Sequence, residues 1–447
     1  MDEISRCYNA VFSEHNLNGI AKNVGFINRV RKISAESFVK ALVFNTESQK
    51  RQSLTDLKFD FLSQINCEIS KVGIHKKFSP EASMFLKEVL KQLISYSIDN
   101  SEIGKSGGFF SCINIKDSSK FRLPKSYLPD YPSYGSYNKQ SALMNLQFEY
   151  DAVTDKWGCL ELTKATRNDQ TDSKETASQT RAGGLYIRDL GYITTTYLTA
   201  VCGNNAYFLN RIPKIGVYLL KDDKFKPLDW ITLDKKMKEG VYSYYEQEVY
   251  LGRKEMLKCR MVINPVSQEV AAGRIRKATQ GGKRTKGYQL SKEYKIKARY
   301  NIFITNVPSE VLCTEQVIDA YRLRWQIELI FKTWKSNLQI HEIKAVKTER
   351  MECQLIARLI WILLNSRLHR VVQILLSKRN PGNACSINKF LKLAVKFSPL
   401  LHKCISHTEL FIVWFEMTIP PLLNDLTIER RLKKDTLYQK LIKLNIS

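Results

Sequence analysis

Five polar side chains between positions 321 and 335 have the types and spacing needed to bind a phosphate group beside a carboxylate. They are Tyr321, Arg324, Glu328, Lys332 and Lys335. At about 100° per residue, these positions fall within roughly a quarter of the circumference of an α-helix. The pattern predicts a helix from about 315 to 337, N-capped by Thr314, with its cations and phenol around one acid.

The remaining positions of this helix are apolar and predict a buried side. We expect that side to pack on the body of the protein through Leu323, Trp325, Ile327, Ile330 and Trp334. A simpler interpretation is a solvated amphipathic helix whose i,i+4 ion pairs each contribute only a few tenths of a kcal/mol. Choosing between the two requires acidic partners elsewhere in the chain.

Two candidate partners follow predicted β-strands. Alternating residues from 109 onward predict a strand with Asp117 at its far end, and GGLYIRDLGY predicts a short buried strand that ends at Asp189. Two further strands, SALMNLQFEYD and KWGCLELTKA, lie between them, and a helix over about 193–202 and the strand AYFLNRI follow. This order is typical of an α/β fold with a ribonuclease H-like mixed sheet.

Two Asp and one Glu would form a site made only of oxygen ligands. Carboxylates without His or Cys favour Mg²⁺ or Mn²⁺, and two such ions roughly 3.5–4 Å apart support phosphoryl transfer. The pattern alone does not single out Asp117, Asp189 and Glu328. The competing acids are Asp151, Asp155, Asp169 and Asp172.

The pattern divides the chain into five predicted parts. These are a helical DNA-binding domain (1–100), the first part of the core (101–211), a β-rich insertion (212–298), the last core strand with the catalytic helix (299–345), and a C-terminal helical domain (346–447). In the first part, Arg29, Arg31 and Lys32 precede a helix that Ser34 should cap, and Ser79 with Pro80 should begin another. The insertion should carry a basic, glycine-containing loop over GRIRKATQGGKRTKGYQLSKEYKIKAR that contacts phosphate.

The composition favours a polyanionic partner. The 447 residues carry a net charge of +26, and 11% are aromatic, which indicates folded nucleic-acid-binding modules better than a basic tail. The N-terminus lacks a signal-peptide layout, and the apolar run 355–368 is interrupted by Arg358 and Arg367 and is too short to span a bilayer. Scattered cysteines without a C-x-x-C pair suit free thiols in a reducing cytosol. We expect a cytoplasmic protein without a membrane partner.

The spacing Tyr321-x2-Arg324-x3-Glu328-x6-Lys335 resembles the signature of the DDE transposases of bacterial insertion sequences, in the insertion-sequence-four group. The segment INIKDSSKFRLP looks like the one that carries the first catalytic Asp of this group. LYIRDLGY looks like the second, and YFLNRI like the strand beyond it. A long β insertion before the Glu is also typical of the group.

The resemblance implies a role for each spaced residue. Asp117, Asp189 and Glu328 would be catalytic and bind two Mg²⁺ or Mn²⁺ ions. The other roles concern DNA: the phosphate at the transposon 5′ end would be held by Tyr321, Arg324 and Lys335, with Lys332 beside them and Arg211 on the terminal base pairs. Arg provides a fork, Lys a point charge and Tyr a hydroxyl donor for phosphate.

The resemblance also implies a reaction and its partners. The enzyme would cleave DNA at the terminal inverted repeats and join the ends to target DNA by a cut-and-paste route, as a homodimer on DNA in the bacterial nucleoid. Members that form a hairpin intermediate often flip a base onto a Trp of the last insertion strand. KARYNIFIT has no clear match for that Trp; Tyr300 is a weak substitute and Trp230 lies elsewhere. The alternatives are a catalytically inactive DNA-binding descendant and a ribonuclease H-like nuclease or resolvase.

Overall fold

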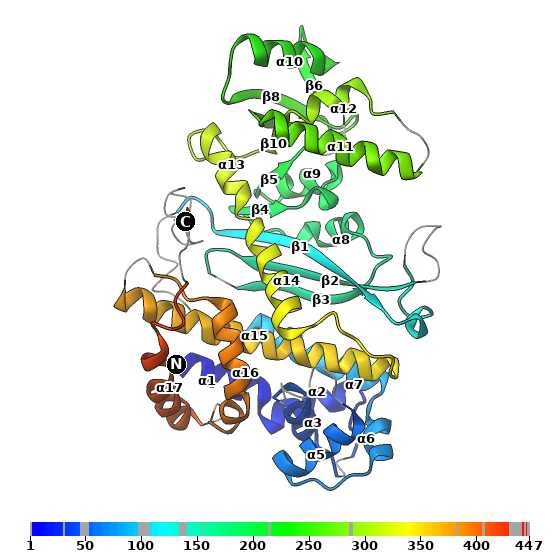
Figure 1. Cartoon of the computed structure of the whole chain (residues 1–447), viewed down its shortest axis with the longest axis vertical. Coiled ribbons are helices and arrows are strands. Elements are labelled where there is room, and N and C mark those ends of the chain that lie inside the picture. The colour runs from blue at the N-terminus through cyan, green and yellow to red at the C-terminus, as the bar shows by residue number, and fades with distance from the viewer. Residues whose placement is uncertain are drawn as a thin grey trace.

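One mixed β-sheet extends from a helical lobe at one end of the molecule into a β-rich lobe at the other in the computed structural model (Figure 1). The structure describes residues 2–29, 32–44, 53–96, 108–133, 141–154, 156–212, 216–285, 289–380, 383–404, 407–428, 440–441 and 444. Arg31 and Asp155 lie outside the described residues.

The ten strands of this sheet are hydrogen-bonded in the order β3-β2-β1-β4-β5-β10-β9-β8-β6-β7. Their bounds are β1 Cys112–Leu123, β2 Ala142–Asp151, β3 Trp157–Lys164, β4 Gly184–Arg188, β5 Tyr207–Arg211, β6 Val217–Lys221, β7 Lys224–Pro227, β8 Tyr245–Leu251, β9 Leu257–Pro265 and β10 Tyr300–Thr305. Strands β1 to β3 are antiparallel neighbours, whereas β4 is parallel to β1 and β5 is parallel to β4. The chain is therefore a mixed α/β protein built on one large sheet.

Strand β1 is longer than the sequence pattern predicts, and Asp117 lies inside it instead of at its end. The parallel pairing with β4 stops at Lys116 opposite Arg188, but the antiparallel pairing with β2 continues as far as Leu123 opposite Ala142. Asp117 is thus the first residue of β1 beyond its parallel neighbour. The antiparallel ladder kept the strand extended past the residue that the prediction treated as its end.

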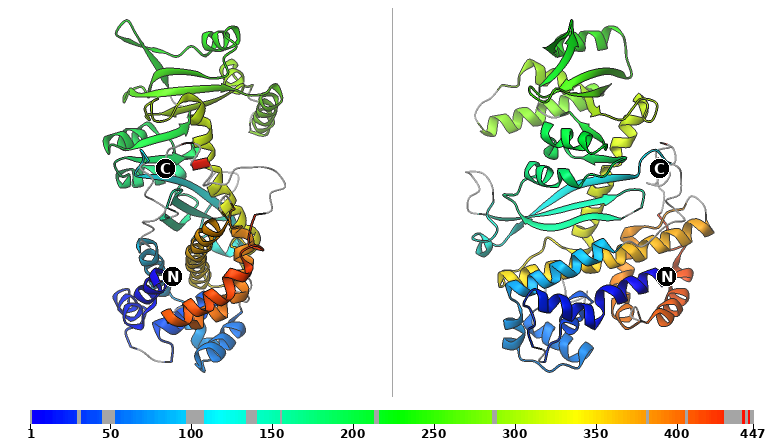
Figure 2. Two further views of the ribbon diagram at one scale, coloured as in Figure 1. Left: turned by 90° about the vertical axis from the view of Figure 1, so that its left-hand side faces the viewer. Right: turned by 180° about the vertical axis from the view of Figure 1, so that it is seen from behind.

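The insertion extends the core sheet. Strand β9 pairs with β10, and β8, β6 and β7 follow outward, so the insertion strands continue the sheet beyond its last core strand. Figure 2 shows this lobe at one end of the molecule. Its helices are α10 Trp230–Glu239, α11 Gln268–Thr285 and α12 Lys292–Lys297. The predicted basic loop, 273–299, is wrong over 273–285, which lies in α11, and over Lys292–Lys297, which forms α12, because helix-forming residues such as Arg274 and Lys277 outweigh the glycines.

The N-terminal and C-terminal helices pack against each other. The helical lobe contains α1 Asp2–Phe12, α2 Glu14–Asn23, α3 Ala35–Val43, α5 Leu54–Ile65, α6 Lys71–Lys77, α7 Pro80–Ser95, α15 Thr348–Arg379, α16 Ile387–Cys404 and α17 Thr408–Leu422. Ser34 and Ser79 cap α3 and α7 as predicted, each accepting a hydrogen bond from a backbone N–H. Figure 2 shows α15 running alongside α7, and one apolar cluster includes residues of both ends of the chain.

Helix α15 is apolar because it forms the centre of this lobe. It is long and apolar enough to cross a membrane by composition alone, but more than half of its most apolar window is buried inside the protein. Leu359, Ile360 and Trp361 are among its buried residues. The helix therefore supplies core contacts to α7 and α3.

A buried ion pair joins β1 to α8 (Asp169–Thr176) beneath the sheet edge where Asp117 lies. The Lys116 Nζ atom is 2.5 Å from Asp172 Oδ2, and both side chains are almost fully buried. Arg167 contacts the other carboxylate oxygen of Asp172 at 3.0 Å. Removing one member of such a pair strands the other charge in a low-dielectric environment.

We expect Asp172→Asn to lower the free energy of unfolding by about 3–5 kcal/mol, because it leaves the Lys116 ammonium buried without an anion. Urea unfolding followed by circular dichroism measures the loss. The control is Asp222→Asn, which removes the exposed pair between Asp222 and Lys226 and should change stability by less than about 1 kcal/mol. Equal effects of the two substitutions would contradict a structural role for the buried pair.

Candidate active site

The predicted single helix over 315–337 is two helices in the structure. Helix α13 covers Thr314–Arg322 and α14 covers Trp325–Leu338, and Cys313, not Thr314, is the N-cap of α13. Between them, the N–H groups of Leu323 and Arg324 donate to carbonyl oxygens three residues back, so the chain tightens into a 3₁₀-like turn. The prediction failed because both halves have good helix propensity and the sequence contains no breaker between them.

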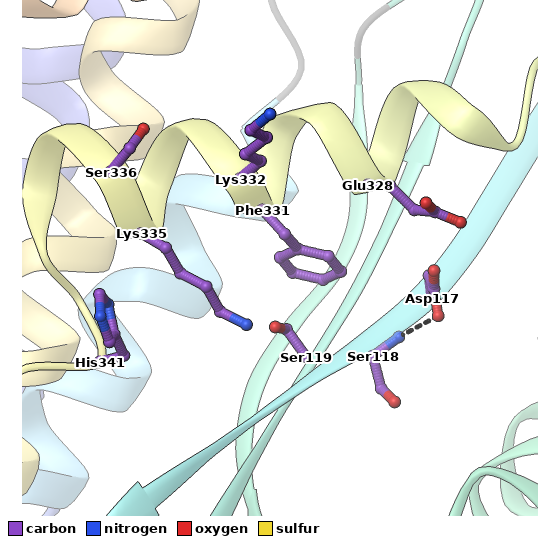
Figure 3. A pocket seen from close by; sticks show the side chains of 9 residues that line it. All are labelled: Asp117, Ser118, Ser119, Glu328, Phe331, Lys332, Lys335, Ser336 and His341. Atoms are coloured by element: carbon purple, nitrogen blue, oxygen red, sulfur yellow. Dashed lines mark hydrogen bonds between the residues drawn. The ribbon is translucent and has the colours of Figure 1, made fainter. Parts of the chain in front are cut away.

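Aromatic packing fixes α14 on the sheet. Trp334 is 2% exposed, and its ring lies 5.0 Å from Phe148 and 5.6 Å from Trp157 between ring centroids. Ile327 is also fully buried, as predicted. Trp325 was predicted to be buried but is 56% exposed, since the turn before α14 rotates it toward solvent. Glu328 and Phe331 of the same helix point toward β1 (Figure 3), so the packing that fixes α14 on the sheet also holds Glu328 over this strand.

The Arg324 guanidinium contacts three carboxylates from three separate elements. Its Nη2 donates to Glu328 Oε1 at 2.6 Å and its Nη1 donates to Asp117 Oδ2 at 3.2 Å, whereas its Nε lies 3.8 Å from Asp189 Oδ1. The Arg324 side chain is only 14% exposed. The structure thus brings together all three acids that the sequence analysis selected. We call this group of four residues the acidic centre.

Asp117 is the most buried carboxylate of the acidic centre. The pKa of Asp117 is raised to about 7, mainly by burial and to a smaller extent by the charges of Asp189 and Glu328, while the N–H of Ser118 and the charge of Arg324 act in the opposite direction. The Ser118 N–H donates to Asp117 Oδ1 at 2.8 Å. Three carboxylates in contact with one cation leave an excess of negative charge, which an additional cation would compensate.

Asp189 directly follows β4, as predicted. The carbonyl of Arg188 accepts a hydrogen bond of 2.9 Å from the Asn210 side chain on β5, which fixes the end of the strand. The buried Arg188 side chain donates to Glu149 at 3.1 Å and lies over the ring of Tyr197. Asp189 is therefore held by its backbone, while its own side chain stays about half exposed.

A pocket opens between β1 and α14 beside the acidic centre (Figure 3). It is lined by Asp117, Ser118, Ser119, Glu328, Phe331, Lys332, Lys335, Ser336 and His341. The Lys335 side chain extends toward Ser119 on β1, whereas Lys332 points away from the strand. Burial lowers the pKa of Lys335. The two lysines expected to act side by side thus take different directions from α14.

The sequence analysis missed the pocket residues Ser118, Ser119 and His341. The serines follow Asp117 directly in β1, so adjacency to a predicted acid was the available signal. His341 comes after α14 has ended, and nothing in its local sequence indicates that the chain folds back toward Lys335. Only the tertiary structure places it at the pocket.

Tyr321 and Arg211 lie on the inner side of the acidic centre. Tyr321 is 8% exposed and its ring packs at 5.1 Å from that of Phe303, so it does not share an open face with Lys335. Its hydroxyl has no hydrogen-bonding partner among the described residues. Burial raises the Tyr321 pKa to about 12, and the nearby charges of Arg324 and Arg211 oppose that rise.

Three of the four competing acids have other roles in the described structure. Asp151 accepts from the N–H of Ile113 at 2.9 Å and so closes the β1–β2 ladder, and Asp172 belongs to the buried ion pair. Asp169 accepts from the Ser118 hydroxyl at 2.9 Å and lies 3.9 Å from Lys120. Asp169 thus contacts Ser118, the residue after Asp117, and among the described residues it forms no salt bridge with Arg324.

The donors of the acidic centre suit a hard divalent cation. All three are carboxylates, and the Arg324 guanidinium occupies the position of positive charge among them. Within the described residues, no three metal-ligating side chains stand close enough to share one ion as they are placed. Binding of Mg²⁺ or Mn²⁺ therefore requires Arg324 to move away from the carboxylates.

The aromatic residues considered for base stacking are buried. Tyr300 is 7% exposed, and its hydroxyl donates to Asp234 Oδ1 at 2.8 Å. Trp230 is also 7% exposed, with the Lys297 ammonium 4.2 Å from its ring centroid. Neither ring is available to a flipped base in this conformation.

Comparisons with known proteins agree with this geometry. A sequence model described as "Transposase DDE domain" matches residues 108–364, more than half of the chain. The chain is 31% identical over 381 residues to the transposase of insertion sequence element IS231D from Bacillus thuringiensis subsp. finitimus, covering 81% of this chain and 79% of the relative. It is 28% identical to the IS1151 transposase of Clostridium perfringens, covering 82% and 80%.

We expect a double-mutant cycle of Arg324→Ala and Glu328→Gln to give a coupling energy of roughly 0.5–3 kcal/mol in metal-free protein, since their contact of 2.6 Å is the shortest in the acidic centre and Arg324→Ala leaves the carboxylates without a cation. Denaturant unfolding of the four proteins measures it. The matched control is the exposed pair of Arg322 and Asp319 on α13, for which the coupling should be about 0.2–0.5 kcal/mol. A coupling no larger than the control would show that Arg324 does not hold the acidic centre together.

Proposed function

Because the chain belongs to the DDE transposase family, we propose that it cleaves DNA at the ends of an insertion sequence and joins those ends to target DNA by metal-dependent phosphoryl transfer. The family match spans all three acids, from Asp117 through Asp189 to Glu328. The observation that carries the proposal is the contact of these three carboxylates with one guanidinium, which requires β1, β4 and α14 to meet at one point. The net charge of +26 over the whole chain suits a DNA substrate.

The three carboxylates would hold divalent cations. Bound Mg²⁺ or Mn²⁺, two ions by the family resemblance, would lower the pKa of a coordinated water or 3′-hydroxyl and neutralise the oxygens of the phosphate. Asp117 contributes the most buried oxygens, fixed by the Ser118 N–H. Asp189 and Glu328 are more exposed and can adjust to the incoming ions.

The cations around the acidic centre would position DNA phosphates. When metal ions take over the negative charge, the Arg324 guanidinium becomes free to fork onto a phosphate. Lys335 reaches toward β1 and would add a point charge beside it, with Lys332 at the rim of the pocket. The buried Tyr321 hydroxyl would donate to the same phosphate after a small opening of the site, and Arg211 would contact the terminal base pairs.

The core is proposed to be ribonuclease H-like. Its support is the order β3-β2-β1-β4-β5 with three antiparallel strands and two parallel ones, and a carboxylate directly after β4. The division at 100, 211, 298 and 345 stays a prediction. The joint apolar cluster of the first and last helices favours treating 1–100 and 346–447 as one folding unit.

We expect Asp117→Asn, Asp189→Asn and Glu328→Gln each to keep binding of the terminal repeat and to lower cleavage by more than about a hundredfold, since each removes a metal ligand. The assay uses a duplex with the terminal inverted repeat that flanks the gene, with Mg²⁺ or Mn²⁺, and EDTA should abolish cleavage. The matched control is Asp319→Asn, an exposed acid of α13 that contacts Arg322. Full cleavage by one of the three variants would remove that residue from the site. Failure of the unsubstituted protein to cleave an end that it binds would favour an inactive DNA-binding descendant.

We also propose that the protein acts as a homodimer on DNA, because two ends must be joined. An exposed apolar stripe on α17 supports contact through the C-terminal helices: Leu410, Val413 and Met417 are each more than half exposed and follow i, i+3, i+7 spacing. Light scattering of the protein bound to end DNA should give a mass that corresponds to two protein chains. The double substitution Val413→Glu and Met417→Glu should reduce the complex to one protein chain. The control is Ile231→Glu, an exposed apolar position on α10. A one-chain, one-end complex that cleaves DNA would contradict the dimer.

A further inference from the structure

Three neighbouring strands place Arg211 and the start of β10 at the same sheet edge as the acidic centre. Asp189 follows β4, Arg211 ends β5, and Tyr300 begins β10, which is antiparallel to β5. These strands are adjacent in the sheet, so their ends lie along one edge. Two strand spacings, roughly 10 Å, separate β4 from β10, and Tyr300 lies three residues beyond Phe303, the partner of Arg211, which adds roughly 10 Å along the strand. The direct distance is therefore roughly 14 Å, or about four base-pair steps of DNA.

Arg274 of α11 is held at this edge by neutral acceptors. Its Nη1 donates to the carbonyls of Tyr300 at 2.8 Å and Ala298 at 3.3 Å, and its Nη2 donates to the Asn301 side chain at 2.6 Å. These bonds fix the guanidinium without neutralising it. In Figure 1, α11 lies beside β10 and β5.

Arg211 and Arg274 form a pair of cations without a carboxylate. Among the described residues, neither makes a salt bridge, although the insertion as a whole offers several acids. Arg211 is paired with Phe303, and the Arg274 guanidinium donates to the side chain of Asn301, which lies two residues along β10 on the same face of the sheet, so the two cations lie near each other. Burial lowers the pKa of Arg274, and the charge of Arg211 lowers it further. Two half-buried like charges cost free energy unless an anion lies between them.

We propose that Arg274 and Arg211 together bind one backbone phosphate of the transposon-end duplex, within about four base pairs of the cleaved phosphate. The inference rests on the proposed function, because it takes the acidic centre as the position of the cleaved phosphate. Arg211 alone was expected from the family resemblance. Arg274 is new, and it gives the insertion a direct role in DNA binding through a residue of a helix.

One phosphate can accept hydrogen bonds from two guanidinium groups at the same time. A phosphodiester offers two charged oxygens, and each Arg can donate to one of them in fork geometry. A phosphate at this position would also offset the repulsion between the two cations. The contact would orient the duplex along the sheet edge without reading its sequence.

The test is a scan of end duplexes that each carry a single methylphosphonate. Each methylphosphonate neutralises one phosphate of the duplex. Binding is measured in Ca²⁺ or EDTA so that no cleavage occurs. The unsubstituted protein should lose roughly tenfold in affinity when the phosphate contacted by both arginines is neutralised. Arg274→Ala should lower affinity for the native duplex, reduce the salt dependence by up to about one phosphate contact, and respond less to that methylphosphonate than the unsubstituted protein does, because only Arg211 still contacts the phosphate.

Two variants separate this role from a structural one. Asn301→Ala removes a hydrogen-bond partner of Arg274 without changing charge, so it should keep the response to the methylphosphonate. Arg276→Ala removes an exposed cation of the same helix and should keep it too. Arg211→Ala combined with Arg274→Ala should weaken binding by less than the product of the single effects, because both act on one phosphate.

The outcomes distinguish this inference from the proposed function. If the unsubstituted protein binds and cleaves the end but Arg274→Ala shows the same phosphate profile, the contact does not exist and the transposase proposal stands. The inference is equally overturned if the sensitive phosphate lies far from the cleavage position. If the protein neither binds nor cleaves the end, the proposed function fails and this inference fails with it.

Discussion

The acidic centre depends on one cation, Arg324, that holds three mutually repelling carboxylates together. Asp117, Asp189 and Glu328 come from β1, from the end of β4 and from α14, and each would repel the other two. The Arg324 guanidinium provides a nitrogen toward each acid. Because it lies in the turn immediately before α14, the backbone that positions Glu328 also positions the cation that neutralises it. The site can therefore be assembled before its substrate and ions arrive.

The rest of the fold supports this arrangement at a distance. Trp334 and Ile327 fix α14 on the sheet, and the pairing of Lys116 with Asp172 fixes the segment of β1 just before Asp117. Both devices act on the backbone near the acids and leave the acids themselves accessible. A rigid frame with adjustable carboxylates suits a site whose charge must change when cations and DNA bind.

The insertion has a closer relation to the site than its place in the sequence indicates. Its strands continue the core sheet beyond β10, and Arg274 of α11 reaches the edge that carries Asp189 and Arg211. A basic segment predicted as a loop would contact DNA only diffusely. As a helix anchored to the start of β10, it presents a fixed guanidinium, which can select one phosphate position.

Local patterns determined much of this protein. The spacing from Tyr321 to Lys335 and the segments around Asp117 and Asp189 resemble the DDE transposases of bacterial insertion sequences, and the comparisons confirmed that family. Such a resemblance depends on residue types and spacing along the chain, which the sequence contains in full. The tertiary structure decided the rest. The antiparallel partner carried β1 past Asp117, a 3₁₀-like turn buried Tyr321 and exposed Trp325, and chain folding brought His341 to the pocket. The extension of β1, the burial of Tyr321 against Phe303 and the position of His341 each depend on a neighbour distant in sequence, so no propensity or spacing within the segment could predict them.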